Sequence, residues 1–320
     1  MKNYKNIYWQ ILLVKLFFLF LILTGTTSCF TGIESTKKIT LSREEKKLTL
    51  PTPEEEYMMS LTSTPLKEWP TGKRFIVSDD KAILVIVPQR GIYPTPPDSL
   101  KGKVMEFLGI ESKINAAGNI NVGLSFTDGA YTYDYDTGKD FEYAMEHFQS
   151  DQIPMLIDED MILMARNLLV GQKFWIRSPL WYDKEGNRID GKKFVEVTVT
   201  GVEPGNLVFP LQLQITTKDN NVAYVFMNFG NADNESRSFH NIFSLTDIKK
   251  HYPAIENDVW ELICNGKVKA GMTKEEVKLS VGNPSDTSSG HDYSQTYDIW
   301  SFDNGMVLWF EDGRLVRTRQ

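Results

Sequence analysis

The pattern of apolar and polar residues divides the chain into an apolar N-terminal run, a polar stretch and three folded regions. Residues 16–23 form an apolar run of eight residues, preceded by Lys2 and Lys5. A membrane-spanning helix needs about 20 apolar residues, so this run is too short to cross a bilayer. A basic start followed by a short apolar run is typical of a secretory signal peptide, here residues 1–28. The polar, charged residues 29–53 then predict a solvated tether.

Residues 54–150 and 151–250 contain the same four kinds of segment in the same order, which predicts two β-rich repeats. An acidic helix start, a strand led by glycine and two further strands appear in each. The matched pairs are 53–59 with 158–164, 72–77 with 171–176, 105–111 with 197–203, and 124–127 with 213–216. Short strands separated by polar turns predict a small antiparallel β-barrel-like unit in each repeat, because closure removes exposed sheet edges.

Residues 251–320 show the pattern of two helices followed by strands. Residues 256–264 are amphipathic with a helical period, which predicts the first helix. Thr273 and Glu276 form a T-x-x-E capping box, which predicts that the second helix begins there. Gly282 is placed to end that helix.

Two hairpin signals, Asn304-Gly305 and Asp312-Gly313, divide the C-terminal segment into three strands. If both turns have two residues, one face carries Trp300, Phe302, Val307, Trp309 and Val316, and the other carries Ile299, Met306, Leu308, Phe310 and Leu315. Helices cover only one face, so we expect the second to meet a neighbouring domain, another protomer or a partner. Trp300, Phe302 and Trp309 are the candidate binding residues on this sheet.

The predicted fold class is therefore α+β, with two tandem small antiparallel β-barrel-like units followed by an α-α-β-β-β domain. The two repeats resemble bacterial SH3-like barrels in their layout. As a whole, the N-terminal part resembles a Bacteroidetes-type exported lipoprotein.

The C-terminal segments 271–277, 281–284, 300–302 and 310–313 together resemble the BamE (SmpA/OmlA) lipoprotein domain. That resemblance implies two helices packed on a three-stranded antiparallel sheet, and a place at the outer membrane as an accessory of β-barrel assembly. Proteins of that family are small, whereas this chain places two long repeats before the domain. The same layout also occurs in secreted enzyme-inhibitor domains, which supplies an alternative function.

A run of small residues ends at Cys29 and resembles a bacterial lipobox. Ser28 and Cys29 match that pattern, whereas Thr26 stands where leucine is usual. The resemblance implies cleavage before Cys29 and its acylation, for example with palmitate, which would anchor the protein without a helix. The alternative is ordinary signal-peptide cleavage, because Thr26 and Ser28 also form a small-x-small site.

The net charge argues against nucleic acid as a partner. The chain has 35 Lys and Arg against 42 Asp and Glu, a net charge of −7. Residues 1–28 hold three lysines and no acid, so their removal leaves a net charge of −10. Such a protein repels the phosphate backbone, whose neutralisation dominates affinity for nucleic acids.

The sequence contains no recognisable catalytic or cofactor motif. Its four histidines are scattered, and HExxH, CxxC, P-loop and GxGxxG patterns do not occur. Cys264 lies in an apolar helical pattern, which favours a small core side chain over a nucleophile. We therefore expect no enzyme activity and no cofactor.

Two clusters in the first repeat are candidates for ligand binding. Asp134, Asp136 and Asp140 could contribute to a calcium loop, but their spacing also fits a solvated acidic turn. Tyr131, Tyr133 and Tyr135 alternate as on one strand face, where they could stack on sugars or pack in the core.

Together these features predict a non-catalytic cell-envelope lipoprotein that acts as a binding or scaffold module. We expect it to be exported, anchored by lipid to the outer membrane facing the periplasm, and bound to another envelope protein in outer-membrane protein assembly or envelope maintenance. The alternative is a secreted enzyme inhibitor or a ligand- or glycan-binding protein.

Overall fold

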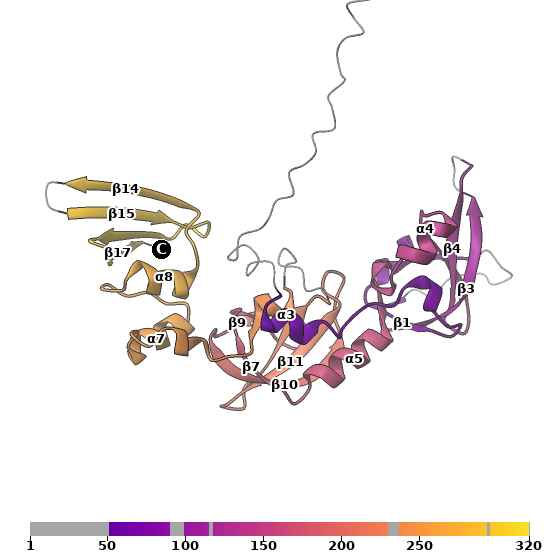
Figure 1. Cartoon of the computed structure of the whole chain (residues 1–320), viewed down its shortest axis with the longest axis horizontal. Coiled ribbons are helices and arrows are strands. Elements are labelled where there is room, and N and C mark those ends of the chain that lie inside the picture. Colours follow the sequence, from indigo (N-terminus) through magenta and orange to yellow (C-terminus); the bar gives the residue numbers. More distant parts are fainter. Residues whose placement is uncertain (1–50, 90–98, 115–117, 230–236, 293–294, 320) are drawn as a thin grey trace, which may run out of the picture. The chain divides into compact units, whose positions relative to one another are not determined.

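The computed structural model describes residues 51–89, 99–114, 118–229, 237–292 and 295–319 (Figure 1). These residues form antiparallel sheets and helices, which confirms the α+β class. The helices are α3 (Pro53–Met58), α4 (Phe141–His147), α5 (Glu159–Leu169), α6 (Phe239–Ile242), α7 (Asn257–Cys264) and α8 (Lys274–Val281). Within the described ranges, no helix is long and apolar enough to cross a membrane. The predicted signal peptide and Cys29 lie outside the described residues.

The first two sheets have the same strand order. The first contains β1 (Arg74–Val77), β2 (Val87–Pro88), β3 (Val104–Ile114), β4 (Ile120–Thr127), β5 (Thr132–Asp136) and β6 (Leu156–Asp158), in the order β2-β5-β4-β3-β1-β6. The second contains β7 (Lys173–Ile176), β8 (Leu180–Tyr182), β9 (Arg188–Asp190), β10 (Val195–Pro204), β11 (Leu211–Thr217), β12 (Val222–Met227) and β13 (Phe243–Ser244), in the order β13-β7-β10-β11-β12-β8-β9. Apart from β9, each strand of the second sheet has a counterpart in the first.

A β-bulge at a corresponding glycine strengthens this match. The register between β3 and β4 shifts between Phe107 and Gly109, and that between β10 and β11 shifts between Val199 and Gly201. Both shifts fall in segments that the sequence aligns. A bulge bends its strand and increases the local twist, so the long strand of each sheet is bent at the same point.

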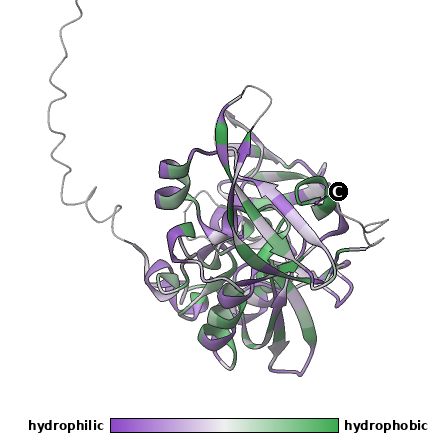
Figure 2. Ribbon diagram, turned by 90° about the vertical axis from the view of Figure 1, so that its right-hand side faces the viewer, coloured by the Kyte–Doolittle hydropathy of each residue, from purple (hydrophilic) through white to green (hydrophobic). Residues whose placement is uncertain are grey.

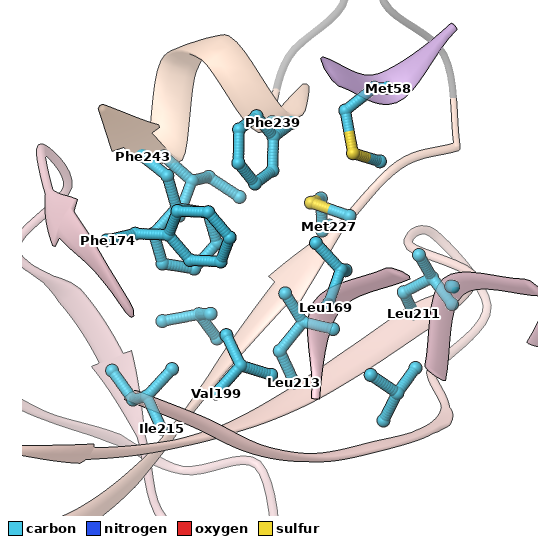
Figure 3. Packing of buried hydrophobic residues seen from close by; sticks show 14 of the residues in the cluster. Met58, Leu169, Phe174, Val199, Leu211, Leu213, Ile215, Met227, Phe239 and Phe243 are labelled. Carbon is cyan, nitrogen blue, oxygen red and sulfur yellow. The ribbon is translucent and has the colours of Figure 1, made fainter. Parts of the chain in front are cut away.

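The helix α3 packs in the core of the second sheet, although the sequence analysis assigned its residues to the first repeat. Met58 lies in one cluster with Phe174 and Phe239 (Figure 3). The Tyr57 hydroxyl donates to the Leu168 carbonyl over 2.8 Å, and its ring lies 5.4 Å from that of Phe239. The pattern of six residues marks a short helix but cannot specify which sheet the helix covers.

Hydrophobic positions concentrate along the strands, whereas the turns are mostly hydrophilic (Figure 2). The first sheet has its own buried cluster, which includes Phe75, Phe126 and Tyr133. A third cluster joins α7 and α8 to the C-terminal sheet through Trp260, Val277 and other side chains. Each sheet therefore has its own apolar core.

The C-terminal sheet has four strands, so the prediction of three was wrong. They are β14 (Asp286–Asp292), β15 (Gln295–Ser301), β16 (Val307–Glu311) and β17 (Arg314–Arg319), paired in chain order. The sequence of β14 is DTSSGHD, with no apolar residue. A hydrophobic pattern could not indicate this strand, which is paired through its main chain with β15.

The capping box at the start of α8 is confirmed. The Thr273 side-chain oxygen accepts from the Glu276 N–H over 3.2 Å, and the Glu276 carboxylate accepts from the Thr273 N–H over 2.7 Å. Two N–H groups at the helix start are thereby satisfied. The helix ends at Gly282, whose φ of +90° favours glycine.

The first predicted turn of this sheet was wrong by one residue. The Phe302 N–H donates to the Met306 carbonyl, so the loop holds three residues, with Gly305 at a φ of +85°. Trp300 consequently lies opposite Leu308, not Trp309. Because side chains alternate along a strand, a shift of one residue exchanges the faces.

The exchange places Trp300 in the core and Trp309 on the opposite face. The Trp300 ring lies 4.5 Å from that of Phe310, and Trp300 is 5% exposed. A bulge in β16 sets Trp309 opposite Arg317, whose guanidinium lies 4.0 Å from the Trp309 ring centre. The Asp312-Gly313 turn has two residues, as predicted, with Glu311 opposite Arg314.

Candidate functional site

The sequence-predicted aromatic candidates do not form one surface. Trp300 is a core residue, Phe302 packs against the same core, and Trp309 lies on the other face of the sheet. Tyr133 is fully buried in the core of the first sheet, and Tyr131 and Tyr135 pack against it. Tyr133 therefore has no surface on which a sugar could stack.

The three candidate calcium ligands are engaged separately. Asp134 accepts hydrogen bonds from Lys113 and Gln89, and Asp136 accepts from Asn121. Asp140 is the N-cap of α4 and accepts from the Tyr143 N–H over 2.8 Å. Among the described residues, no group of three or more potential metal ligands occurs.

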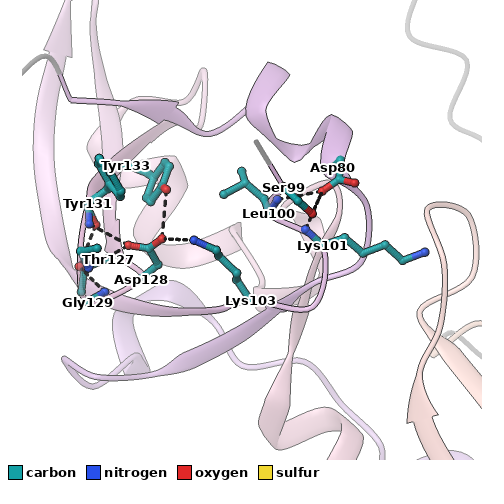
Figure 4. A network of polar contacts seen from close by, with 11 residues as sticks. Asp80, Ser99, Leu100, Lys101, Lys103, Thr127, Asp128, Gly129, Tyr131 and Tyr133 are labelled. Carbon is teal, nitrogen blue, oxygen red and sulfur yellow. Dashed lines mark hydrogen bonds and ion pairs between the residues drawn. The ribbon is translucent and has the colours of Figure 1, made fainter. Parts of the chain in front are cut away.

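The first sheet instead contains a partly buried polar cluster formed by Lys103, Asp128 and Tyr133, which we call the Tyr133 cluster (Figure 4). Asp128 accepts from Lys103 Nζ over 2.9 Å and from the Tyr133 hydroxyl over 3.2 Å. Burial alone would raise the pKa of Asp128, but hydrogen bonds from Lys103 and from backbone N–H groups outweigh it and hold that pKa below its ordinary value. Burial, with the nearby Asp128 charge, raises the pKa of Tyr133.

A second carboxylate holds the segment that leads into this cluster. Asp80 Oδ1 accepts from the Ser99 hydroxyl and from the N–H groups of Leu100 and Lys101, each over 2.8 Å (Figure 4). These contacts fix the chain just before Lys103. The ring of Tyr133 therefore sits among side chains that are themselves held in place.

The strand registers show which residue of the second sheet corresponds to Tyr133. Phe126 lies opposite Tyr133 in the first sheet, and Ile215 lies opposite Ala223 in the second. Phe126 and Ile215 occupy the same position in the aligned segments 124–127 and 213–216. Ala223 therefore stands where the first sheet has a tyrosine.

The other two members of the Tyr133 cluster are also replaced. By the same register, Thr217, the last residue of β11, takes the position of Asp128, which directly follows β4. Val195 lies opposite Ile176 in the second sheet. In the first sheet Lys103 takes the matching place beside Val77, whose N–H donates to the Lys103 carbonyl. Val195 therefore stands where the first sheet has a lysine. The second sheet therefore has an alanine, a threonine and a valine where the first has the phenol, the carboxylate and the ammonium.

A pocket of about 550 Å³ occupies this part of the second sheet. Val195, Thr217 and Ala223 all contribute to its lining. Four aromatic residues add to its walls, namely Trp175, Trp181, Phe194 and Trp260. The Trp181 ring is fixed by a hydrogen bond of 3.1 Å from its Nε1 to the Ser178 carbonyl. The pocket therefore combines aromatic and aliphatic side chains with polar and charged ones.

Phe194 reaches the pocket from a backbone conformation that favours glycine. Its φ is +59°, and its N–H donates to the Ile176 carbonyl. The corresponding residue in the first sheet is Gly102, with a φ of +80° and the matching bond to Val77. A side chain there costs about 1–2 kcal/mol. The Phe194 ring stacks on Trp260 at 5.6 Å, a contact that contributes about 0.5–1.5 kcal/mol beyond area burial and offsets much of that cost.

Charged residues of both signs surround these apolar walls. Glu196 pairs with Lys218 over 3.1 Å and with Lys173 over 3.6 Å. The hydrogen bond from Lys218 holds the pKa of Glu196 below its ordinary value. The remaining charged residues of the lining are Asp190, Lys192, Asp219, Asp247 and Lys249. Apolar walls with a mixed-charge rim suit the binding of an apolar group carried by a polar molecule.

Sequence reasoning missed this pocket. The aligned segments end at Thr127 and Thr216, one residue before Asp128 and Thr217. Beyond them the two repeats differ in length by one residue, because Tyr133 follows Phe126 by seven residues and Ala223 follows Ile215 by eight. The strand registers are therefore needed to pair Tyr133 with Ala223.

Comparison with known proteins identifies no relative. No family model, no curated protein and no solved structure matches the chain. The pocket must therefore be interpreted from its own chemistry and from the first repeat.

Lys193, next to Phe194, is another buried residue that the sequence did not indicate. Its Nζ donates to the Ser280 carbonyl, and its backbone N–H donates to the Cys264 carbonyl over 2.9 Å. Burial lowers the pKa of Lys193 to about 8. Burial also raises the pKa of Cys264 to about 11, so the thiol is neutral at pH 7. The prediction that Cys264 is a core residue is confirmed.

These two shifts predict how stability depends on pH. Between pH 8 and 9, the unfolded Lys193 (pKa 10.5) keeps a proton that the folded one has lost. The unfolded state then binds more protons, so the free energy of unfolding rises with pH, by up to about 1.4 kcal/mol per unit. Between pH 9 and 10.5, the unfolded Cys264 (pKa 9.0) loses a proton that the folded thiol retains, which cancels the rise.

The test compares urea unfolding of the wild type and Cys264→Ala at several pH values. We expect the rise to stop near pH 9 in the wild type and to continue in the variant. The difference between the two proteins isolates Cys264 from other groups that titrate at high pH. A difference that stays constant from pH 8 to 10.5 would contradict the assignment.

Proposed function

We propose that this chain is an exported, lipid-anchored protein of the cell envelope that binds another envelope protein and catalyses no reaction. The short apolar run at residues 16–23 and the small residues before Cys29 support export and acylation. In this proposal the acyl chains hold the protein at the outer membrane, facing the periplasm. The acidic composition supports a protein partner over nucleic acid.

We also infer a finer architecture. The common strand order of the first two sheets and their matched bulges support tandem SH3-like barrels. The two helices and the hairpins of the C-terminal region support a BamE-like domain, with β14 as an additional strand relative to that family's layout. This resemblance supports a role in outer-membrane protein assembly or envelope maintenance.

The observation that carries the proposed binding function is the pocket of the second sheet. It offers about 550 Å³ with aromatic walls and a charged rim, the composition typical of a binding site. Val195, Thr217 and Ala223 of its lining stand where the first repeat has Lys103, Asp128 and Tyr133. This difference between the repeats supports a binding role for the second one.

The proposal can be tested by cross-linking and pull-down from cells that make the tagged full chain. A Cys29→Ala variant serves as the unanchored control. We expect the wild type to fractionate with the outer membrane, to incorporate an alkyne-labelled palmitate, and to recover envelope proteins after detergent extraction. Cys29→Ala should lose the label and recover those proteins at least tenfold less efficiently.

Two other outcomes would contradict this function. Recovery of one soluble target that is insensitive to Cys29→Ala would favour a secreted inhibitor or ligand-binding protein. Turnover of a substrate by the purified full chain would contradict a non-catalytic role.

A further inference from the structure

The C-terminal sheet has a second face, opposite the one on which α7 and α8 pack. The core face meets these helices through Trp300, Phe310 and other buried side chains. On the second face the strand registers set Ile299 opposite Trp309 and Trp309 opposite Arg317. The next row holds Val307 opposite Arg319. We call these five residues the arginine face.

Both arginines lie against the same tryptophan ring. The guanidinium carbons of Arg317 and Arg319 are 4.0 and 5.9 Å from the centre of the Trp309 ring. Within the parts of the chain that the structure describes, neither guanidinium makes a hydrogen bond or an ion pair, and both side chains are exposed. A guanidinium stacked on a ring keeps the N–H groups at its edge for a carboxylate. Both arginines therefore have donors available to a ligand.

The acidic residues of the same face do not neutralise this pair. Glu311 lies opposite Arg314 at the other end of β17. Asp286 lies on β14, three strand spacings from β17, which is about 14 Å. Exposed charges separated by more than about 10 Å are largely screened at physiological ionic strength. The arginine face is therefore locally basic, on a chain whose net charge is −7.

The composition of the arginine face favours a polypeptide over a lipid surface. Ile299, Val307 and Trp309 are only partly exposed, so the centre of the face offers little apolar surface for insertion among acyl chains. Tryptophan and arginine are enriched among the residues that dominate the binding energy of protein interfaces. The planar guanidinium also matches a carboxylate through two parallel hydrogen bonds.

We propose that the arginine face binds an acidic segment of a partner polypeptide, whose carboxylates pair with Arg317 and Arg319. The two arginines are two residues apart on one strand, about 7 Å along its axis. An extended segment with carboxylates at alternate residues has the same repeat. This inference rests on the proposed function, because it adds to the pocket a second surface for the partner.

The first test measures binding of a fluorescein-labelled peptide of alternating glutamate and serine. The purified full chain in detergent is titrated and the anisotropy of the label is followed. We expect saturable binding that weakens as the salt concentration rises, because salt screens exposed charges. The same peptide with glutamine in place of glutamate should bind at least tenfold more weakly.

Three double variants connect this binding to the arginine face. Arg317→Glu with Arg319→Glu reverses both charges and should weaken peptide binding at least tenfold. Arg317→Lys with Arg319→Lys keeps the charges but not the planar fork, and should weaken it about 2- to 10-fold. Lys67→Glu with Lys81→Glu makes the same change of charge at exposed lysines of the first repeat and should leave binding within about twofold.

Several results would overturn the inference. Equal binding of the glutamate peptide by the wild type and the folded glutamate variant, as judged by its melting transition, would place the acidic segment elsewhere. If that variant does not fold, Arg317→Gln with Arg319→Gln decides the question by the same criterion. Displacement of the peptide by phosphatidylglycerol added to the micelles, but not by phosphatidylcholine, would show that the face takes an anionic lipid.

Pull-down from cells separates this inference from the proposed function. We expect Arg317→Glu with Arg319→Glu to recover the envelope proteins at least tenfold less efficiently than the wild type, while still incorporating the palmitate label at Cys29. Equal recovery by the folded variant and the wild type would exclude the arginine face as a partner site and leave the anchored binding function intact.

Discussion

Tyr133→Ala is expected to lower the free energy of unfolding by about 3–5 kcal/mol, the range for the loss of a large buried aromatic side chain. The ring is fully buried and packs with the core of the first sheet. Its removal would also take one hydrogen bond from Asp128, whose pKa is already held low by Lys103 and backbone N–H groups. Urea unfolding followed by circular dichroism measures the loss.

Tyr133→Phe is the matched control, because it keeps the ring and removes only the hydroxyl. We expect it to cost about 1.5 kcal/mol, the low end of the usual net contribution of a hydrogen bond to a charged group. A loss below 1 kcal/mol in Tyr133→Ala, or equal losses in the two variants, would show that the ring is not a core element. The correspondence with Ala223 would then lose its physical meaning.

Lys73→Met is expected to be similarly damaging, by about 3–5 kcal/mol, because it leaves a buried carboxylate without its counter-charge. Lys73 Nζ lies 2.9 Å from Asp158 Oδ1, and the two side chains are 1% and 0% exposed. Lys73 also pairs with Asp160 over 2.7 Å. The pair joins the residue before β1 to the start of α5, so its loss would destabilise both elements.

The matched control combines Lys73→Met with Asp158→Asn. Asparagine removes the charge and keeps an oxygen that can accept from the Asp160 N–H, as Asp158 does over 3.0 Å. We expect the double variant to recover most of the stability lost in Lys73→Met, with a coupling that a double-mutant cycle in urea at pH 7 measures. A single Lys73→Met variant within 1 kcal/mol of the wild type would contradict the importance of the pair.

The sequence predicted most reliably what short-range chemistry determines. The Thr273–Glu276 capping box and the Asp312-Gly313 turn follow from neighbouring residues, and both are observed. The repeat was visible because four segments share one order, and the two sheets share one strand order. Local hydrogen bonds and periodicity need no knowledge of the tertiary fold.

Features that depend on one residue of register, or on distant packing, could not be predicted. Asn304-Gly305 fits a two-residue turn, but the loop also includes Asp303, which exchanges the faces of Trp300 and Trp309. The polar strand β14 has no hydrophobic signal. The sequence of α3 does not specify which of the two cores Met58 packs in.

The candidate site was missed for a related reason. Tyr133 was identified as a possible binding residue, yet the structure shows that it fills the core of its own sheet. The residue at the corresponding position of the second sheet is Ala223, and an alanine in a sequence does not indicate a functional site. Its meaning comes from a comparison with Tyr133 that requires the registers of β5 and β12.

Labelling with an alkyne palmitate of cells that make the full chain tests most directly whether this is a lipid-anchored protein of the cell envelope. We expect the wild type to carry the label and to fractionate with the outer membrane, and Cys29→Ala to carry none. A wild type that stays unlabelled and is released as a soluble protein would contradict this account.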